Sequence, residues 1–316
     1  MRTLLTIMTI LWACHLGATT YFVNAHGNGD GSSWSLASND LPAILAACQA
    51  GDQVWVAAGT YHPTTGTDRQ ASFIIPSGVA VYGGFVGFEQ QLNERNIASN
   101  QTILSGEIGA PGIQDNSFSV IYTEGVDAST QLNGFIITQG NANGKGEEGN
   151  PTRCGGGWFN QGAHGQASNP TIQNCIFRNN SGRDGAAFYS NGVAGMSNPV
   201  FSACQFVANQ ADLDGGAIYV NAQERGESIL TMEACLFDEN MASYGAGVFA
   251  KKGTGECKLL INNCTFQNNT AFLWGGGVYN IAGNGSPFDL DIEENCKFSE
   301  NYPSDINKQV YLANKE

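Results

Sequence analysis

The chain is poor in basic residues. Its 316 residues include 14 Lys and Arg against 28 Asp and Glu, which gives a formal net charge of −14. A surface with so few cations offers little to the phosphates of nucleic acid, so we expect no nucleic-acid partner. The same balance disfavours a polyanionic ligand unless a metal ion lies between the two.

Patterns typical of metal sites and membrane spans are also missing. The nine cysteines contain no CxxC pair, and the four histidines show no ligand spacing: His15, His26, His62 and His164. We therefore expect no metal and no cofactor. Beyond the first residues, no apolar run is long enough to cross a bilayer, so we expect no transmembrane segment.

The N-terminus resembles a secretory signal. Arg2 precedes an apolar stretch at 4–13, and small residues follow at Gly17 and Ala18. The sequence therefore predicts a signal peptide at 1–18 and a single mature domain at 19–316. An alternative is lipidation at Cys14, which we favour less because Trp12 is bulky for a lipobox. Both readings predict a secreted protein or one on the outer cell surface.

Glycine, in contrast, is abundant, and five of the 41 glycines recur every thirty residues. Each opens a phrase of small, small, apolar and aromatic residues. These glycines are Gly155, Gly185, Gly215, Gly245 and Gly275. A second phrase, Cys-x-Phe-x-x-Asn, keeps step with the first and begins at Cys175, Cys204, Cys235, Cys264 and Cys296. Such a period indicates one structural unit stacked on copies of itself.

The phrases have the length of strands and no helical period. We therefore predict an all-β, single-stranded, right-handed parallel β-helix, regular from about residue 153, with two or three short strands per unit. One strand is expected at 171–177, and another over each five-residue glycine phrase. A short helix at 42–48, with Asp40 or Asn39 as its N-cap, is expected to cap the N-terminal end.

Stacked units place equivalent side chains in columns. We expect the Cys and Phe of the second phrase to form a buried column of free thiols and rings. The Asn residues are expected to form a hydrogen-bonded ladder at a turn. A further aromatic stack is expected at Phe159, Tyr189, Tyr219, Phe249 and Tyr279. Cys154 and Cys257 fall outside the column and are interpreted as loop thiols or a stray pair.

Two segments break the pattern. The glycine-rich, charged segment 141–152 is expected to form a surface loop. Near the end, Asp305 has the phase of a sixth glycine, and Val310 and Tyr311 keep the apolar and aromatic positions. We expect this C-terminal end to be weakly capped, or covered by another chain or a missing segment.

The paired phrases Phe-x-x-Asn and Gly-Gly-Ala-Ile resemble the repeats of chlamydial polymorphic outer-membrane proteins and of related Bacteroidetes surface proteins. The stretch 41–61 is similar to the first turn of pectin-lyase-like right-handed β-helix proteins. The opening 21–34 resembles secreted Bacteroidetes members of that group. The resemblance covers nearly the whole mature chain and implies the fold. It leaves function open, because such folds include polysaccharide lyases, hydrolases, phage tailspikes and adhesins.

One irregular strip lies just before the glycine phrases. Stacking would bring Asp184 and Asp214 onto neighbouring units, beside Arg153 and Arg183, and adjacent carboxylates raise a pKa in a way that acid–base chemistry uses. Tyr244 and Trp274 continue the line and are candidates, together with the two aspartates, for contact with a sugar. If the protein is an enzyme, the catalytic candidates are Arg153, Arg183, Asp184 and Asp214. The structural alternative is that Asp before Gly is a turn residue.

Three hypotheses follow. The first is a non-enzymatic secreted or surface protein that acts in adhesion or binds polysaccharide or a host cell-surface glycan. The second is a polysaccharide lyase or glycoside hydrolase that uses the strip. The third is a structural spacer that presents loops such as 141–152. We favour the first, because the strip lacks a catalytic signature.

Overall fold

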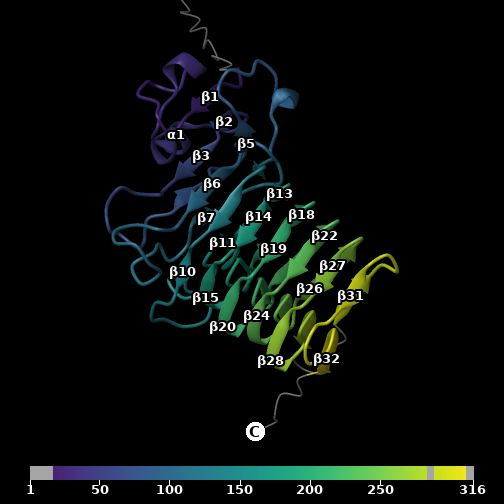
Figure 1. The fold of residues 1–316 in the computed structure, drawn as a ribbon. Helices are drawn as coiled ribbons and strands as arrows, with labels where there is room; N and C mark the ends of the chain where they lie inside the picture. Colours follow the sequence, from purple (N-terminus) through teal and green to yellow (C-terminus); the bar gives the residue numbers. More distant parts are fainter. Residues whose placement is uncertain (1–16, 283–287, 311–316) are drawn as a thin grey trace, which may run out of the picture.

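The computed structural model describes residues 17–282 and 288–310. The predicted signal peptide, apart from Gly17 and Ala18, and the alternative lipidation site Cys14 lie outside the described residues. Within these ranges the chain winds into a parallel β-solenoid of about nine turns (Figure 1). The predicted parallel β-helix is therefore confirmed.

Four sheets, here called A to D, run along the described part of the solenoid. Sheet A contains β1 (Thr20–Val23), β2 (Gln53–Ala57), β5 (Ala80–Phe85), β8 (Gln131–Asn133), β12 (Ala167–Ser168), β13 (Thr171–Gln173), β17 (Met196–Ser197), β18 (Val200–Ser202), β22 (Glu227–Glu233), β26 (Glu256–Asn262) and β30 (Asp289–Ile292). Sheet B contains β3 (Gly59–Tyr61), β6 (Thr102–Ser105), β9 (Ile136–Thr138), β14 (Ile176–Arg178), β19 (Gln205–Val207), β23 (Leu236–Asp238), β27 (Thr265–Gln267) and β31 (Lys297–Ser299).

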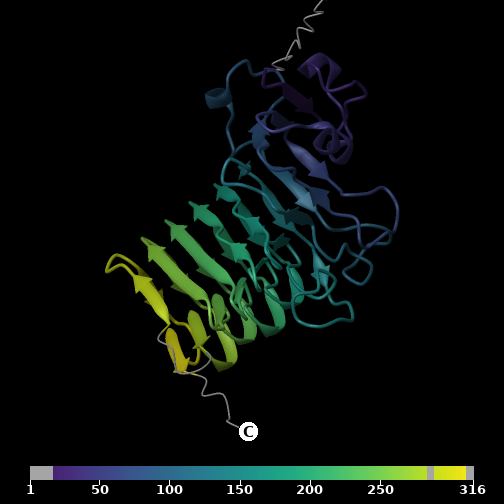
Figure 2. The same ribbon diagram turned by 180° about the vertical axis from the view of Figure 1, so that it is seen from behind.

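Sheet C contains β4 (Phe73–Ile74), β7 (Ile121–Glu124), β11 (Trp158–Gln161), β16 (Phe188–Asn191), β21 (Ile218–Ala222), β25 (Val248–Lys252), β29 (Val278–Ala282) and β32 (Ile306–Val310). Sheet D contains β10 (Asn141–Ala142), β15 (Ser181–Asp184), β20 (Gln210–Asp214), β24 (Met241–Tyr244) and β28 (Thr270–Trp274). A regular turn visits the sheets in the order A, B, D, C. Figure 2 shows the same solenoid from behind.

The strand count per turn differs from the prediction. The expected strand at 171–177 is two strands, because Asn174 has a left-handed backbone with φ 52° and bends the chain from sheet A into sheet B. Asn179, at φ 53°, makes the next bend into sheet D. Regular turns therefore have at least four strands, and the sheet-D strand was missed. Asn tolerates this backbone region better than most residues. Ala203 and Ala208 make the same two bends one turn later, so the bend recurs without Asn.

The recurrent glycines form the corner between sheets D and C, and each sheet-C strand begins at the fourth residue of the phrase. The expectation that the whole phrase is a strand was therefore wrong. Gly215 has φ 69°, and a Cβ there would lie 2.6 Å from the carbonyl oxygen of Ile218. Only glycine fits a left-handed corner against its own chain so closely.

The interior confirms the predicted columns. The phenylalanines of the second phrase stack ring on ring, with centroids 4.4–5.1 Å apart, and we call them the inner stack: Phe177, Phe206, Phe237, Phe266 and Phe298. In the asparagine ladder each side-chain amide donates to the Oδ1 of the next turn, at 2.8–3.1 Å. The column cysteines are free thiols, buried except for half-buried Cys296.

Cys154 and Cys257 are not loop thiols or a pair. Both are fully buried and free, and they belong to different apolar clusters. Cys257 lies in β26 and faces the main core, whereas Cys154 pairs with Asp184 at the start of the D–C corner. Burial raises the pKa of both thiols, because a thiolate would be desolvated there.

The N-terminal cap has the predicted form. Helix α1 (Leu41–Ala47) begins after Asp40, whose side chain accepts from the Ala43 amide at 3.0 Å. The helix buries Leu41, Ile44 and Leu45 in the main core. Two short 3-10 helices, η1 (Trp34–Leu36) and η2 (Leu92–Glu94), lie in the same N-terminal part.

The register at the other end differs from the prediction. Strand β32 pairs Ile306 with Val278, so Ile306 occupies the apolar position that we assigned to Val310. Ile306 packs against the main core, whereas Tyr311 lies outside the described residues.

Candidate functional site

The strip predicted before the glycines exists as a line across sheet D. Cys154 pairs with Asp184, Asp184 with Asp214, Asp214 with Tyr244, and Tyr244 with Trp274. The two aspartates therefore lie on neighbouring turns, and the two aromatic residues continue the line. The structure divides this strip into a covered acidic half and an open aromatic half.

Asp184 is the more buried of the two aspartates, with 2% of its side chain exposed. Its Oδ2 lies 2.9 Å from Arg153 Nε, in an ion pair whose N–H is not aligned for a hydrogen bond. The Cys154 thiol donates to the same oxygen at 3.7 Å. Burial raises the pKa of Asp184, and Arg153 opposes that rise.

The segment predicted as a surface loop covers this half. Asn141–Ala142 is strand β10, and residues 143–152, which we call the strap, cross the outer face of sheet C. Glu148 attaches the strap. Its carboxylate accepts from the Tyr219 hydroxyl at 2.6 Å and from Asn221 Nδ2 at 3.1 Å, and its other oxygen lies 2.8 Å from Lys251 Nζ. The strap is therefore docked on the solenoid wall.

Asp214 lies between these groups and is half-buried. Burial raises its pKa to about 7, with further contributions from the charges of Asp184 and Glu148, while Lys251 and Arg153 oppose the rise. With Asp214 protonated, the remaining charges balance as two carboxylates against two cations. The raised pKa of Asp214 therefore lowers the net negative charge of this cluster as the pH falls below neutral.

Arg183 does not join the cluster. It is half-buried, and within the described residues its side chain makes no ion pair or hydrogen bond. The sequence missed Glu148, Lys251 and the Tyr219 hydroxyl. The position of Lys251 could have been predicted from the repeat, because Lys251 is in register with Asn221. The position of Glu148 could not, because Glu148 lies in an irregular loop outside the repeat.

The aromatic half is open. Tyr244 is half-buried and packs against Tyr279, with ring centroids 5.4 Å apart. Trp274 is 41% exposed and lies 6.2 Å from the Tyr244 ring. Phe272 and Leu273, beside it on β28, are also exposed. An exposed run of three large apolar residues is unusual for a solvated strand and is typical of a contact surface.

The outer face of sheet C carries the second predicted aromatic column, and this prediction is also confirmed. Its rings, which we call the outer stack, are Tyr122, Phe159, Tyr189, Tyr219, Phe249 and Tyr279. The stack extends one turn further toward the N-terminus than predicted, to Tyr122, whose ring lies 5.9 Å from Phe159 and parallel to it.

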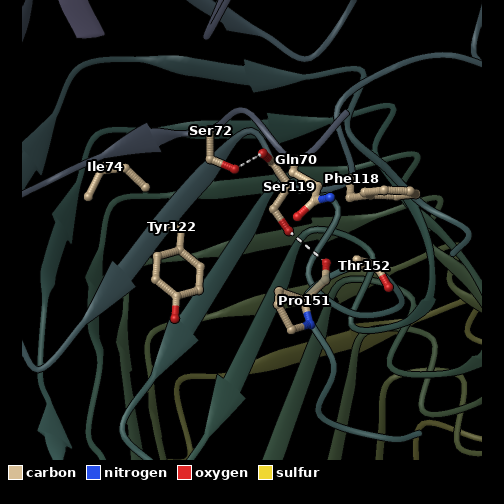
Figure 3. A pocket seen from close by; sticks show the side chains of 8 residues that line it. All are labelled: Gln70, Ser72, Ile74, Phe118, Ser119, Tyr122, Pro151 and Thr152. Carbon is tan, nitrogen blue, oxygen red and sulfur yellow. Dashed lines mark hydrogen bonds between the residues drawn. The ribbon is translucent and has the colours of Figure 1, made fainter. Parts of the chain in front are cut away.

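A cavity of about 260 Å³ opens beside Tyr122 (Figure 3). Tyr122 and Ile74 line one side, and Pro151 and Thr152 of the strap line another. The remaining lining residues are Gln70, Ser72, Phe118 and Ser119. Periodicity did not predict this cavity, because it joins three segments that precede the regular repeats.

Two classes of feature are absent from the described residues. In ranges 17–282 and 288–310, no group of three or more His, Cys, Asp or Glu is arranged to hold a metal ion. None of the helices in those ranges has the length and hydropathy needed to span a bilayer.

Comparisons with known proteins complete the description. A model of the Chlamydia polymorphic membrane protein repeat matches residues 263–281, which comprise β27, β28 and the start of β29. Comparison with curated protein sequences finds no match. The crystal structure of pectate lyase Pel9A is similar, at 15% identity, over 94% of this chain and 78% of that chain, with a TM-score of 0.45.

Proposed function

We propose that this protein is a secreted or cell-surface β-helix repeat protein that binds glycans without cleaving them. The observation that carries the proposal is the division of the strip. Asp184 is buried and ion-paired with Arg153 and Asp214 is half-buried, whereas Trp274 and its neighbours face solvent. On such a surface the aromatic rings are accessible to a ligand, whereas the carboxyl groups are less so.

Exposed aromatic rings suit sugars because the C–H face of a pyranose is apolar while its hydroxyls remain hydrated. Trp274 supplies the largest such ring on sheet D, and Tyr244 orients it from the next turn. The acidic balance of the chain favours neutral or cationic glycans over acidic ones. The match to a membrane-protein repeat of Chlamydia supports a location at the cell surface.

A glycan array and retention on insoluble polysaccharides test this proposal. We expect the wild-type chain to bind at least one polysaccharide and Trp274→Ala to bind about tenfold more weakly. Phe88→Ala is the matched control, because Phe88 is 70% exposed but lies far along the chain in the N-terminal turns. Failure of the wild-type chain to bind any glycan, or equal binding by Trp274→Ala, would contradict the proposal.

One observation supports catalysis as a second candidate function. Asp214 is half-buried and has a pKa of about 7, a value suited to a general acid or base at neutral pH. Incubation with uronate polymers, monitored by the absorbance of unsaturated products, tests a lyase, and release of reducing ends tests a hydrolase. Activity that is lost in Asp214→Asn would favour this candidate, and no product from the wild-type chain would remove it.

A further inference from the structure

We infer that the cavity beside Tyr122 is a subsite for a single neutral pyranose ring. This inference rests on the proposed glycan binding and adds a second contact, on another sheet from Trp274. It begins from a property of stacked rings. Within the outer stack, the rings of adjacent turns cover both faces of every internal ring. Only a terminal ring can therefore offer a face to a ligand.

Tyr122 is the terminal ring on the N-terminal side. Phe159 covers one of its faces. On the next turn, the register places Ile74 opposite Tyr122, and no described aromatic ring stacks there. The column thus ends in an aliphatic side chain, 54% exposed, at a position that carries a ring on each of the six strands from β7 to β29 in sheet C. The cavity occupies this break in the stack (Figure 3).

The size of the cavity fits one ring. A cavity of about 150 Å³ holds a benzene molecule, so 260 Å³ accommodates a single pyranose with its hydroxyls but not two rings. Tyr122, Ile74 and Phe118 supply the apolar wall. A longer glycan would leave through the open side, toward solvent.

The polar atoms of the wall suit a ligand that is rich in hydroxyl groups. The hydroxyls of Ser72 and Ser119 donate to the carbonyl oxygens of Ser119 and Pro151, at 2.6 and 3.3 Å. Each hydroxyl therefore keeps acceptor capacity. The Gln70 amide, which is exposed and makes no side-chain hydrogen bond within the described residues, adds donors. A hydrocarbon ring would use neither the remaining acceptor capacity of the two hydroxyls nor the donors of Gln70.

Charge selects a neutral sugar. None of the eight lining residues is ionisable at neutral pH. The nearby cation, Arg69, is already engaged: its guanidinium donates to Asn116 O and Asn141 O, at 2.7 and 3.0 Å, and lies over the Phe118 ring. Glu124 accepts from the Tyr122 hydroxyl at 3.0 Å and would repel a carboxylate on the ligand.

Saturation-transfer NMR with methyl glycosides of glucose, galactose and mannose tests the inference, with methyl glucuronoside and phenol as comparison ligands. We expect transfer to at least one neutral glycoside and none to the glucuronoside. Ile74→Trp extends the outer stack and fills the cavity, so it should weaken glycoside binding at least tenfold with no loss of thermal stability. Tyr122→Ala should have the same effect on binding, whereas Tyr122→Phe keeps the ring and should bind within about threefold of wild type.

Trp274→Ala separates this inference from the proposed function. If the inference holds, that variant loses retention on polysaccharide but still binds the methyl glycosides. If glycosides give no transfer, if phenol alone binds, or if Ile74→Trp binds as wild type does, the subsite is refuted, whatever the polysaccharide result. Loss of polysaccharide retention in Trp274→Ala would then still support glycan binding at sheet D.

Discussion

The inner and outer stacks are built in the same way but lie in different surroundings. Both place one ring per turn, in register, on parallel strands. The inner stack is enclosed by the solenoid, and its rings lie 4.4–5.1 Å apart and within 11° of parallel. The outer stack is covered by attached parts, namely the strap and Tyr244, and its ring pairs tilt by up to 32°.

The difference shows where variation is tolerated. The inner column is all phenylalanine, because a hydroxyl there would need a buried partner. The outer column mixes Phe and Tyr. The Tyr219 hydroxyl donates to Glu148 of the strap, and the Tyr189 hydroxyl accepts from Asn221 of the next turn at 2.8 Å. The inner stack therefore maintains the fold, whereas the outer stack joins the fold to its irregular segments.

The largest expected effect is on the inner stack. Phe237 has rings packed on both faces and no exposed surface, so Phe237→Ala should lower the free energy of unfolding by about 3–5 kcal/mol. Chemical denaturation followed by circular dichroism measures it. The exposed Phe88→Ala should change stability by less than about 0.5 kcal/mol. A loss below about 1.5 kcal/mol in Phe237→Ala would contradict a dominant role of the inner stack in stability.

The second effect concerns the acidic cluster beneath the strap. Because burial raises the pKa of Asp214 to about 7 from an ordinary 3.8, the unfolded chain releases this proton at lower pH than the folded chain. Its contribution to stability is thus complete below about pH 4 and is lost as the pH rises to about 7. Asp214→Asn should be about 2 kcal/mol more stable than wild type at pH 8, after allowance for partial solvent screening.

At pH 4 the same variant should match wild type, because both side chains are then neutral. Denaturation midpoints of both proteins, measured from pH 4 to pH 8, give the difference in stability as a function of pH. A constant difference across that range would show that Asp214 does not titrate near neutrality, and the charge balance proposed for the cluster would be wrong.

The smallest expected effect is local. Glu148→Ala removes the three contacts of the strap with Tyr219, Asn221 and Lys251, and should cost about 1 kcal/mol of global stability. Hydrogen exchange in residues 143–152 should rise at least tenfold, while the inner strands keep their protection. Glu147→Ala, at an exposed neighbouring position, is the control. Unchanged exchange in Glu148→Ala would mean that other contacts hold the strap.

The sequence predicted the regular features of the molecule well, because each turn repeats the same physical constraints. The corner glycines, the ladder asparagines and both ring columns recur at one position per turn, so their stacking followed from spacing alone. The number of strands did not follow, because the bends at Asn174 and Asn179 depend on backbone angles that no period reveals. The strand of sheet D was not predicted for this reason.

The candidate site was predictable only in part. The line from Asp184 to Trp274 followed from the register, since those residues precede the glycines. Its covering did not, because Glu148 reaches Tyr219 across 71 residues of chain from an irregular segment. The cavity beside Tyr122 likewise joins segments without repeats. The parts of the candidate site that the sequence did not predict lie where the repeat is interrupted, because periodicity places no residue there.

The corner glycine has a consequence for how this protein can change in length. One glycine per thirty residues sets the junction between two sheets, and every column is counted from it. Removing 215–244 would join Asp214 to Gly245 and bring Cys204 next to Cys264 with no frame lost. Gains or losses of one whole unit are therefore neutral to the architecture, whereas a change of a few residues within a unit is not. Recombination between units can thus lengthen or shorten the molecule by whole units. Each such change moves Trp274 farther from Tyr122 or nearer to it by the height of one turn.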